Sequence, residues 1–437
     1  MTWLRNFVYL SILAVVWPLL AWRAWKHGKY RDGWSAKFLG QAPQREGDRP
    51  CIWFHAVSVG EVNLLAPILS RWEILYPDWD VVISTTTRTG FELANKKYGP
   101  RTVFYAPLDF SWAVDRALAR VRPTLLVLAE LEVWPNQLEF AERRGVPVAV
   151  INGRLSDKSF RGYSKIRGWL QPAFAKLSLV AAQNDSYASR FTALGAESSH
   201  VHITGSIKFD GVNTERDNPL TQKLAAAAGI QDDDFVFLAG STQESEEAAA
   251  LDAFEQIAPG FPETRLILVP RHPERFADVA KFLRERKVRF QLRSELDKHG
   301  PDPQVRVLLV DAVGELGGWW GTAHAAFVGG SLTRRGGQNM IEPAAYGAAV
   351  CVGPNTWNFR DVVERMLKSD AAVVVRDTSQ LTNFLHLCLA KPQYAADLGR
   401  RARELVLQQR GAADRTIELM QRLLPDAKAP VRGRAAA

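Results

Sequence analysis

Short apolar runs alternate with helical stretches along most of the chain. In the first part, the predicted strands are residues 51–57, 80–84, 102–105, 124–129 and 146–151. Helical stretches follow the first, second and fourth of these runs, starting near Glu61, Thr89 and Trp134. The runs are continuously apolar, as expected when helices cover both faces of a sheet. This βαβ succession predicts a parallel, doubly wound α/β sheet.

A second series of the same kind follows a polar, irregular segment at residues 211–220, which is the predicted linker. Its predicted strands are residues 235–239, 265–269, 305–310, 325–328 and 349–352. A helical stretch at residues 393–424 completes this half, and the tail at residues 425–437 is predicted to be disordered. Two such halves facing one another predict a cleft lined by the carboxyl ends of both sets of strands.

The length of 437 residues exceeds that of one ordinary core and agrees with two domains. The predicted division is an N-terminal anchor and basic flank at residues 1–40, one Rossmann-like domain at 41–212, a second at 213–424, and the tail. Hydrophobic residues make up 47% of the chain and charged residues 23%, which is typical of a globular protein and not of a disordered or fibrous one.

The cysteines and the net charge limit the classes of function. Cys51, Cys351 and Cys388 form no CxxC pair, which argues against a disulfide framework or a zinc site and fits a reducing compartment. The net charge of +8 is compatible with nucleic acid, an anionic membrane or anionic substrates, and does not choose among them.

The N-terminus carries an uncharged, aromatic-rich run at residues 7–22, followed by basic residues from Arg23 to Lys37. A secretory signal peptide has the opposite order of charge and apolar run, so we expect a membrane anchor. The run is slightly short for a span, although Trp3 and Trp22 are suitable interfacial anchors. Spanning, lying in the interface and packing as a buried helix all remain open. If the run spans, the basic flank places the remaining chain in the cytoplasm.

The first candidate site is the turn Ser58-Val59-Gly60-Glu61, between a strand and a helix. Glu61 lies near the helix N-terminus, where the helix dipole favours an ionised carboxylate, and a carboxylate in a cleft can accept a proton from a hydroxyl. On spacing alone the turn favours ordinary helix capping. His55, in the apolar strand before it, is interpreted as a core histidine with a satisfied hydrogen bond.

Two acids, Glu130 and Glu132, follow another apolar strand, where a buried carboxylate needs a partner. Pro135 suits the first turn of the next helix, so one acid could simply cap that helix. A basic stretch then follows the next strand end. Its members are Arg154, Lys158, Arg161, Lys165 and Arg167. It is either a solvated helix face or a site that captures phosphates or carboxylates.

The second half carries the segment 269–276, with Arg271, His272 and Arg275 after a strand, and a glycine-rich segment at residues 329–339 ahead of Glu342. Glycine-rich backbone leading into a helix predicts an open anion site, because free N–H groups point at the ligand. Glu342 could accept hydrogen bonds from two ribose hydroxyls. The segment is neither a Walker A loop nor a GxGxxG fingerprint, so its chemistry indicates only a nucleotide or phosphate.

Asp78-Trp79-Asp80 spells a metal-binding DxD, but it follows Tyr76-Pro77 ahead of a strand and is interpreted as turn chemistry. No other acid or histidine cluster has metal-ligand spacing.

Together these segments resemble the Kdo transferases, which transfer 3-deoxy-D-manno-octulosonate (Kdo) from CMP-Kdo to a lipid A precursor. The resemblance extends to about residue 405. Its markers are HAVSVGE (55–61), ELEVWPN (130–136), NGRLSDKSF (152–160), AAQND (181–185), TGSIKFD (204–210), PRHPERF (270–276), VGEL (313–316), FVGGSLTRRGGQNMIEPAAYG (327–347) and GPNTWNF (353–359). It implies the GT-B fold, with the acceptor in the N-terminal domain and the nucleotide in the C-terminal one.

The resemblance also implies roles for individual residues. Glu61 matches the family's general base, and Glu130 and Lys208 match residues that stabilise the transition state. The implied CMP-contacting positions are Pro270, Arg271, Val313, Gly314, Glu315, Asn339, Met340, Ile341 and Glu342. Arg271 and Lys208 would clamp the departing phosphate.

The implied reaction is inverting and needs no metal or other cofactor, with Glu61 deprotonating a glucosamine 6-hydroxyl. The implied partners are CMP-Kdo, the lipid A precursor, whose phosphates the basic stretch suits, and the bilayer of the bacterial inner membrane. The catalytic domains are expected on its cytoplasmic side, with no nucleic-acid partner.

Four positions depart from the family's pattern. Gln243 and Ser245 stand where a histidine and a glycine are usual, Gln338 replaces a histidine, and Arg88 replaces a proline. They put details of donor contact and acceptor choice in doubt.

A silent nucleotide- or lipid-binding homologue is disfavoured because a pure binder needs no general base. A GT-B transferase with another donor is a further alternative. A sugar-nucleotide epimerase is disfavoured by the apolar anchor, since such enzymes are usually soluble.

Overall fold

The computed structural model describes residues 2–27 and 32–424, and the predicted disordered tail at residues 425–437 lies outside the described residues. The described chain forms two compact units. The first contains residues 2–211 and 410–424, and the second contains Val212–Gln409. Each unit holds a parallel sheet of seven strands, so the prediction of two doubly wound α/β domains is confirmed.

The first unit is built on a sheet with the strand order β3-β2-β1-β4-β5-β6-β7. The bounds of its strands are β1 Cys51–His55, β2 Asp80–Thr85, β3 Thr102–Tyr105, β4 Leu125–Ala129, β5 Val148–Gly153, β6 Leu179–Ala182 and β7 Val201–Ile203. The order reverses between β1 and β4, which pair directly. Ligands bind outside the carboxyl ends of strands at such a switch point.

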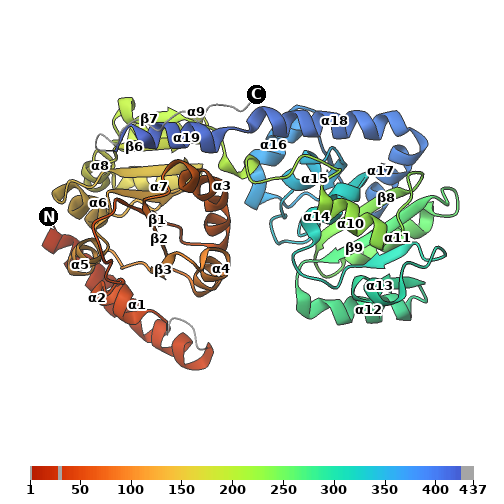
Figure 1. Cartoon of the computed structure of the whole chain (residues 1–437), viewed down its shortest axis with the longest axis horizontal. Coiled ribbons are helices and arrows are strands. Elements are labelled where there is room, and N and C mark those ends of the chain that lie inside the picture. Colours follow the sequence, from red (N-terminus) through yellow and green to blue (C-terminus); the bar gives the residue numbers. More distant parts are fainter. Residues whose placement is uncertain (1, 28–31, 425–437) are drawn as a thin grey trace. The chain divides into compact units, whose positions relative to one another are not determined.

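Helices lie on both faces of this sheet (Figure 1). The helices of the first unit are α1 Thr2–His27, α2 Trp34–Leu39, α3 Val59–Leu75, α4 Arg88–Tyr98, α5 Ser111–Val121, α6 Pro135–Arg143, α7 Asp157–Lys165, α8 Arg167–Phe174, α9 Asp185–Leu194, α19 Ala412–Gln421 and the 3-10 turns η1 Ser198–His200 and η2 Ile207–Phe209. Successive residues of β1 point to opposite faces, so Ile52 and Phe54 enter one core and Trp53 enters the other.

The second unit has the strand order β10-β11-β9-β8-β12-β13-β14, with its switch point between β8 and β12. The strands are β8 Phe235–Thr242, β9 Thr264–Pro270, β10 Phe290–Leu292, β11 Val307–Leu309, β12 Ala325–Val328, β13 Ala349–Val352 and β14 Val373–Val374. The helices are α10 Pro219–Ala227, α11 Glu246–Ile257, α12 Phe276–Glu285, α13 Arg293–His299, α14 Leu316–Thr322, α15 Ile341–Ala345, α16 Arg360–Lys368, α17 Thr378–Ala390, α18 Pro392–Gln409 and the 3-10 turns η3 Pro273–Arg275 and η4 Trp357–Phe359.

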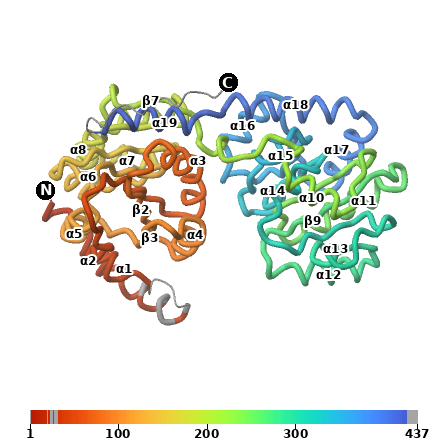
Figure 2. Tube along the Cα trace, viewed as in Figure 1, coloured from red at the N-terminus to blue at the C-terminus, as the bar shows by residue number. Residues whose placement is uncertain are grey.

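The C-terminal helices correct one predicted boundary. The sequence predicts one helical stretch at residues 393–424 in the second domain, but Gly411, at φ 87°, separates α18 from α19. Asp210 fixes the start of α19, because its carboxylate accepts hydrogen bonds from the N–H groups of Gly411 and Ala413 at 2.5 and 2.7 Å. Helix α19 therefore belongs to the first unit, against α3 and β6 (Figure 2).

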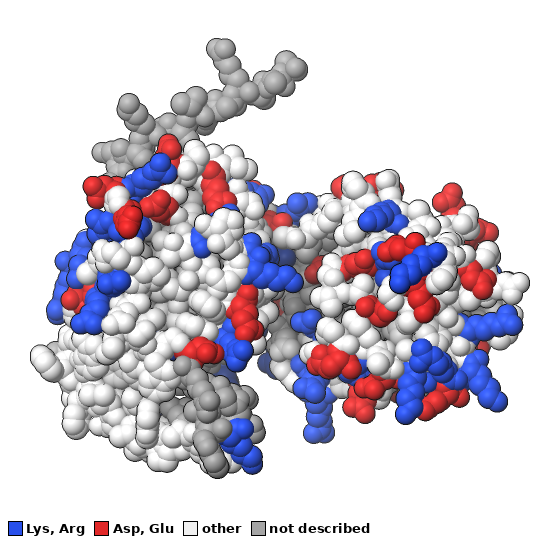
Figure 3. Space-filling model, turned by 60° about the horizontal axis from the view of Figure 1, so that its bottom comes forward, with Lys and Arg blue, Asp and Glu red and all other residues white. Residues whose placement is uncertain are grey.

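The predicted N-terminal anchor forms α1. Residues Thr2–Leu19 make it the one helix, within the described parts of the chain, whose length and composition would allow it to cross a membrane. Its exposed apolar side chains include Trp3, Phe7 and Val15, and Trp34 and Leu39 of the adjoining α2 are also exposed. The side of the unit on which α1 lies shows a broad face with few charged residues (Figure 3).

Candidate functional site

The turn between β1 and α3 is closed by reciprocal hydrogen bonds between Ser58 and Glu61, a variant of the capping box in which the carboxylate reaches the Val57 N–H. The Ser58 side chain accepts a hydrogen bond from the Glu61 N–H, and the Glu61 carboxylate accepts from the Ser58 hydroxyl at 2.8 Å and from the Val57 N–H at 2.9 Å. Both partners satisfy donors at the helix start. The capping interpretation of Glu61 is therefore confirmed.

The same carboxylate also has the acidity of a base that works at neutral pH. Burial raises the pKa of Glu61 to about 7, against the opposing effect of its hydrogen bonds from Val57 and Ser58. The charges of Glu130 and Glu132 raise it further. A general base is most effective when its pKa lies near the working pH. Capping and proton abstraction are thus compatible roles for one side chain.

Glu130 follows β4, the strand beside β1 at the switch point. Its backbone has φ 56°, a left-handed conformation that is rare outside glycine and that clusters at functional sites. Its Oε1 lies 3.7 Å from Lys208 Nζ and 3.5 Å from Asn152 Nδ2. The structure therefore brings the three predicted catalytic residues to one edge of the first sheet, with Glu130 paired to Lys208.

Asn152 belongs to this site but was not singled out as a candidate in the sequence. It lies at the end of β5, is fully buried and has φ 52°. Its Oδ1 accepts hydrogen bonds from the Ile207 N–H at 3.0 Å and the Ser206 hydroxyl at 3.3 Å. It thereby holds the segment that carries Lys208. Its place at the start of the matched segment NGRLSDKSF, directly after a strand, was the available signal.

Neither acid of the segment 130–132 caps the helix that follows. Helix α6 begins at Pro135, as predicted, but its N-cap residue Trp134 makes no side-chain cap bond. The indole of Trp134 instead donates to Glu132 at 3.0 Å, and burial raises the pKa of Glu132. The amides of α6 bind Asp109, described below. Neither acid is therefore used as a helix cap; at the sheet edge Glu130 pairs with Lys208 and Glu132 accepts from Trp134.

The basic stretch begins at the same edge and continues through α7, which has no buried residues. Phe160 and Tyr163 of α7 are partly buried in the same core cluster as Leu131 and Val133. Burial raises the pKa of Tyr163, and the nearby charge of Glu132 raises it further. Helix α7 therefore lies beside the carboxylate loop and presents exposed Lys and Arg side chains there.

Two simpler interpretations are confirmed. His55 is buried, its Nδ1 lies 2.9 Å from Ser84 Oγ, and burial lowers its pKa to about 4, so it is a neutral core histidine. Asp80 begins β2, and its carboxylate accepts from Arg45 at 2.9 Å. Among the described residues, no group of three or more His, Cys, Asp or Glu could hold a metal ion.

In the second unit, the predicted donor positions come to the carboxyl edge of the sheet. Pro270 ends β9, residues 313–315 follow β11, and residues 339–342 lead into and begin α15 after β12. Burial raises the pKa of Glu342, against the opposing effects of its hydrogen bond from Asn339 and of the charge of Arg271, which is exposed. The Glu342 carboxylate accepts from Asn339 Nδ2 at 2.9 Å.

Some side chains at this edge of the sheet are already hydrogen-bonded within the protein. Arg293 donates to both oxygens of Glu315 at 2.9 and 3.2 Å, and the Trp319 indole donates at 3.2 Å. Val313 is 72% exposed, and Gly314 has φ 93°. What this segment offers a ligand is therefore its backbone and the Val313 side chain, while the Glu315 carboxylate holds the turn.

The first part of the predicted anion site in the glycine-rich segment, residues 330–333, is already filled, whereas the residues that lead into α15 take no part in this contact. A side chain of the protein, the fully buried Glu246 at the start of α11, already occupies it. Its carboxylate accepts from the N–H groups of Gln243, Gly330, Ser331, Leu332 and Thr333 at 2.9, 2.6, 3.0, 2.9 and 3.3 Å. A nest of amides binds any carboxylate, and here the anion comes from the chain itself.

The structure shows the surroundings of three of the four residues that depart from the family pattern. Ser245 has φ 75°, which glycine adopts without strain, so the usual glycine fits the backbone better. The Gln338 side chain lies against Gly330. Arg88 is exposed and pairs with Glu92 at 2.8 Å. Nothing in the structure explains the choice of the Gln243 side chain.

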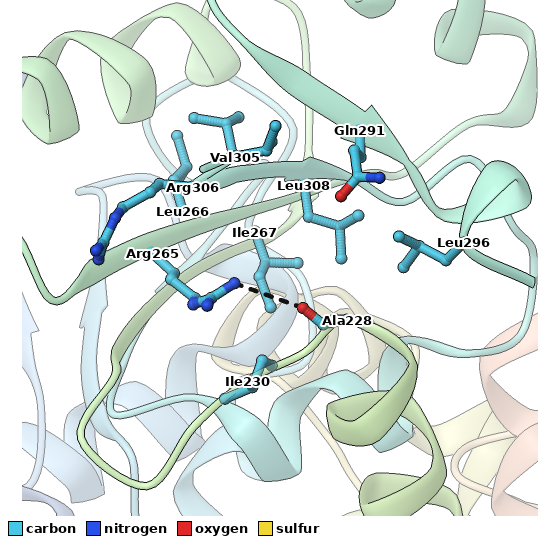
Figure 4. Close-up of a pocket in the computed structure, with 11 residues that line it drawn as sticks. Ala228, Ile230, Arg265, Leu266, Ile267, Gln291, Leu296, Val305, Arg306 and Leu308 are labelled. Carbon is cyan, nitrogen blue, oxygen red and sulfur yellow. Dashed lines mark hydrogen bonds between the residues drawn. The ribbon is translucent and has the colours of Figure 1, made fainter. Parts of the chain in front are cut away.

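A separate pocket lies at the opposite edge of the second sheet, at the starts of β9 and β11 (Figure 4). Its lining includes Ile230, Leu266 and Leu308, and Arg265 donates across it to the carbonyl of Ala228 at 3.5 Å. It contains none of the candidate site residues.

Comparison with known proteins assigns the family. Residues 32–211 match the family model described as 3-deoxy-D-manno-octulosonic-acid transferase (kdotransferase). The chain is 32% identical to the 3-deoxy-D-manno-octulosonic acid transferase of Haemophilus influenzae over 95% of this chain and 98% of the relative. It is also 32% identical to that of Bordetella pertussis over 95% and 98%.

A solved structure supports the fold. UDP-GlcNAc 2-epimerase from Neisseria meningitidis superposes with a TM-score of 0.59 at 12% identity, covering 85% of this chain and all of that chain. Each unit described above has the Rossmann-like sheet of GT-B glycosyltransferases. With these relatives matched over nearly their whole length, the chain belongs to the 3-deoxy-D-manno-octulosonic acid (Kdo) transferase family of glycosyltransferases.

Proposed function

We propose that the protein transfers Kdo from CMP-Kdo to the 6-hydroxyl of a lipid A precursor, with inversion and without a metal. One observation carries the mechanism: Glu61, with a pKa of about 7, lies at the switch point where Glu130 pairs with Lys208. A proton acceptor poised at neutral pH is what activation of a hydroxyl requires.

In this reaction Glu61 accepts the proton of the acceptor hydroxyl. The hydroxyl oxygen then attacks the anomeric carbon of Kdo, and the bond to CMP breaks with its electron pair leaving on the phosphate. A single displacement of this kind inverts the anomeric configuration. Glu61 is partly buried and keeps two hydrogen bonds, so its carboxylate is fixed in direction before substrate binds.

The remaining residues supply charge and position. Lys208 and Arg271 provide the positive charge that the leaving phosphate needs, and Glu130 fixes Lys208 by their ion pair. The CMP group is proposed to bind the carboxyl edge of the second sheet. Its contacts are Pro270, Arg271, the backbone of residues 313–315, and residues 339–342. The exposed basic residues of α7 are suited to the phosphates of the acceptor.

The membrane anchor is proposed to lie in the interface of the inner membrane, with the catalytic units on the cytoplasmic side. Arg5, Asn6 and Tyr9 are bonded to the first unit, so the start of α1 stays on that unit's side. The apolar stretch that remains, residues 10–22, extends about 20 Å as a helix. Crossing the hydrocarbon core takes about 30 Å. An in-plane helix with exposed Trp3, Phe7 and Val15 fits this geometry.

Transfer is expected to continue in excess EDTA, because the proposed charges on the phosphate come from Lys208 and Arg271. The test is incubation of the purified full chain with CMP-Kdo and tetraacyl lipid A precursor, read by mass spectrometry. The product is expected to gain the mass of Kdo at unchanged rate with chelator. Loss of activity that added divalent metal restores would contradict the metal-free mechanism. Binding of CMP-Kdo without transfer would favour a silent homologue, and transfer from another nucleotide sugar would favour a different donor.

A further inference from the structure

Helix α1 carries buried polar side chains that membrane anchoring does not require. Arg5 is 2% exposed and Asn6 is 4% exposed, on a helix whose other side chains are largely exposed and apolar. Arg5 donates to the carbonyl of Pro135 at 3.3 Å. A buried polar group must be hydrogen-bonded to be tolerated, so these contacts fix where α1 lies on the first unit.

Asn6 acts as a cap for a different helix. Helix α5 begins at Ser111, and its own N-cap residue Phe110 provides no side-chain bond. Asn6 Oδ1 accepts from the Ser111 N–H at 3.1 Å, and Asn6 Nδ2 donates to the Ser111 hydroxyl at 2.6 Å. The same Oδ1 accepts from Asn136 Nδ2 at 3.2 Å. One side chain of α1 thus joins the starts of α5 and α6.

Tyr9 completes the connection through Asp109. The phenol donates to Asp109 Oδ2 at 2.9 Å. The Asp109 carboxylate in turn accepts from the N–H groups of Asn136 and Gln137 at 3.0 and 2.8 Å. Burial raises the pKa of Asp109 to about 6 against these hydrogen bonds. Asp109 therefore supplies the N-terminal cap that α6 lacks, and Tyr9 holds Asp109 in place.

The start of α6 is also the end of the catalytic loop. Residues 130–134 connect β4 to α6, and they carry Glu130, Glu132 and the Trp134 indole that binds Glu132. The loop is short, so a displacement of the first turn of α6 moves the backbone on which Glu130 is held at φ 56°.

We propose that α1 is a positioning element of the acceptor-side site: Asn6 and Tyr9, acting through Asp109 and Asn136, hold the first turn of α6 and thereby the loop that carries Glu130 and Glu132. This inference rests on the proposed transfer reaction. It gives α1 a second role beside anchoring, so that docking of the helix and the geometry of the catalytic loop depend on the same residues.

The test separates positioning from anchoring by measuring transfer in detergent micelles with the full chain, where membrane attachment is not needed. Tyr9→Phe removes only the hydroxyl, and Asn6→Ala removes the cap of α5. The matched control is Phe7→Ala, because Phe7 is 67% exposed on the same helix. We expect Tyr9→Phe to lower kcat about three- to tenfold, the usual cost of one buried hydrogen bond. The KM for CMP-Kdo and the kcat of the control are expected to stay unchanged.

A second readout excludes a merely structural effect. The groups that act on Glu61 are the Val57 N–H, the Ser58 hydroxyl, and the charges of Glu130 and Glu132, which raise its pKa. If the loop is displaced in Tyr9→Phe, Glu61 loses part of the effect of these two charges, and the acid limb of the pH–kcat/KM profile moves to lower pH. A smaller folded fraction would scale the whole profile without moving that limb.

A double-mutant cycle with Asp109→Asn tests the route of the coupling. The two substitutions are expected to be non-additive in kcat, because both break the same connection. The inference is overturned if Tyr9→Phe and Asn6→Ala leave kcat and the acid limb at the control's values, or if the cycle is additive. Failure of the proposed function looks different, since the wild-type chain would then transfer no Kdo at all.

Discussion

Replacing Glu61 with glutamine is expected to lower kcat for Kdo transfer by about 10²–10⁴-fold, the usual contribution of a positioned general base. The amide cannot accept the hydroxyl proton, whereas its oxygen can still accept a hydrogen bond from Ser58 or Val57, so the capping role is largely kept. Transfer is measured with purified full chain in detergent, and binding of CMP-Kdo is measured in parallel by calorimetry.

The expected pattern is a lost turnover with unchanged donor affinity, because Glu61 lies in the first unit and the proposed donor positions lie in the second. A matched control is Glu92→Gln, which neutralises an exposed carboxylate on α4 of the same unit. If Glu61→Gln transferred Kdo at close to the wild-type rate, Glu61 would be only a helix cap and the assigned base would be wrong.

Replacing Glu246 with alanine is expected to destabilise the second unit by about 3–5 kcal/mol. Removing the carboxylate takes the acceptor from five amides, those of Gln243 and of residues 330–333. Each donor that stays unsatisfied costs about 1–3 kcal/mol, and water entering the emptied site satisfies the others. For a unit of this size the loss corresponds to a melting temperature lower by about 10 °C, measured by calorimetry. Affinity for CMP-Kdo should fall as well, since the same segment leads into residues 339–342.

The control for this substitution is Glu244→Ala, which removes an exposed acid two residues away and should leave both quantities unchanged. Glu246→Gln is expected to fall between the two, because one amide oxygen can satisfy some of the donors. An unchanged melting temperature for Glu246→Ala would show that the nest tolerates an empty centre, and the structural role given to Glu246 would then be wrong.

Much of the fold was predictable because its strands are continuous apolar runs bounded by turns. The strand before Glu61, the helix start at Pro135 and the core role of His55 follow from such local patterns. The short strands β6, β7, β10 and β14 were missed, since runs of two to four residues carry little periodicity. The division of the last helical stretch was missed because Asp210, which caps α19, is about 200 residues away in sequence.

The candidate site was harder to predict than the fold, because several of its contacts join residues that are far apart in the sequence. Local sequence patterns predict Glu61 and the acids after β4 as site residues. A glycine-rich segment, however, has the pattern of an anion site whether or not a carboxylate of the chain occupies it. Glu246 reaches those amides across more than eighty residues of chain, and Tyr9 reaches Asp109 across 100 residues. Long-range capping of this kind depends on how the helices pack, and no local pattern records it.

The most direct test of the account is the pH dependence of kcat/KM for the wild-type chain with CMP-Kdo and lipid A precursor, because kcat/KM reports the pKa of the free enzyme's base. Burial raises the pKa of Glu61 to about 7, and only its ionised form can accept the hydroxyl proton. The predicted profile therefore rises about tenfold per pH unit below pH 7 and levels off above it. A rate that stays level down to about pH 5, near the ordinary pKa of a glutamate, would contradict Glu61 as a base tuned by burial.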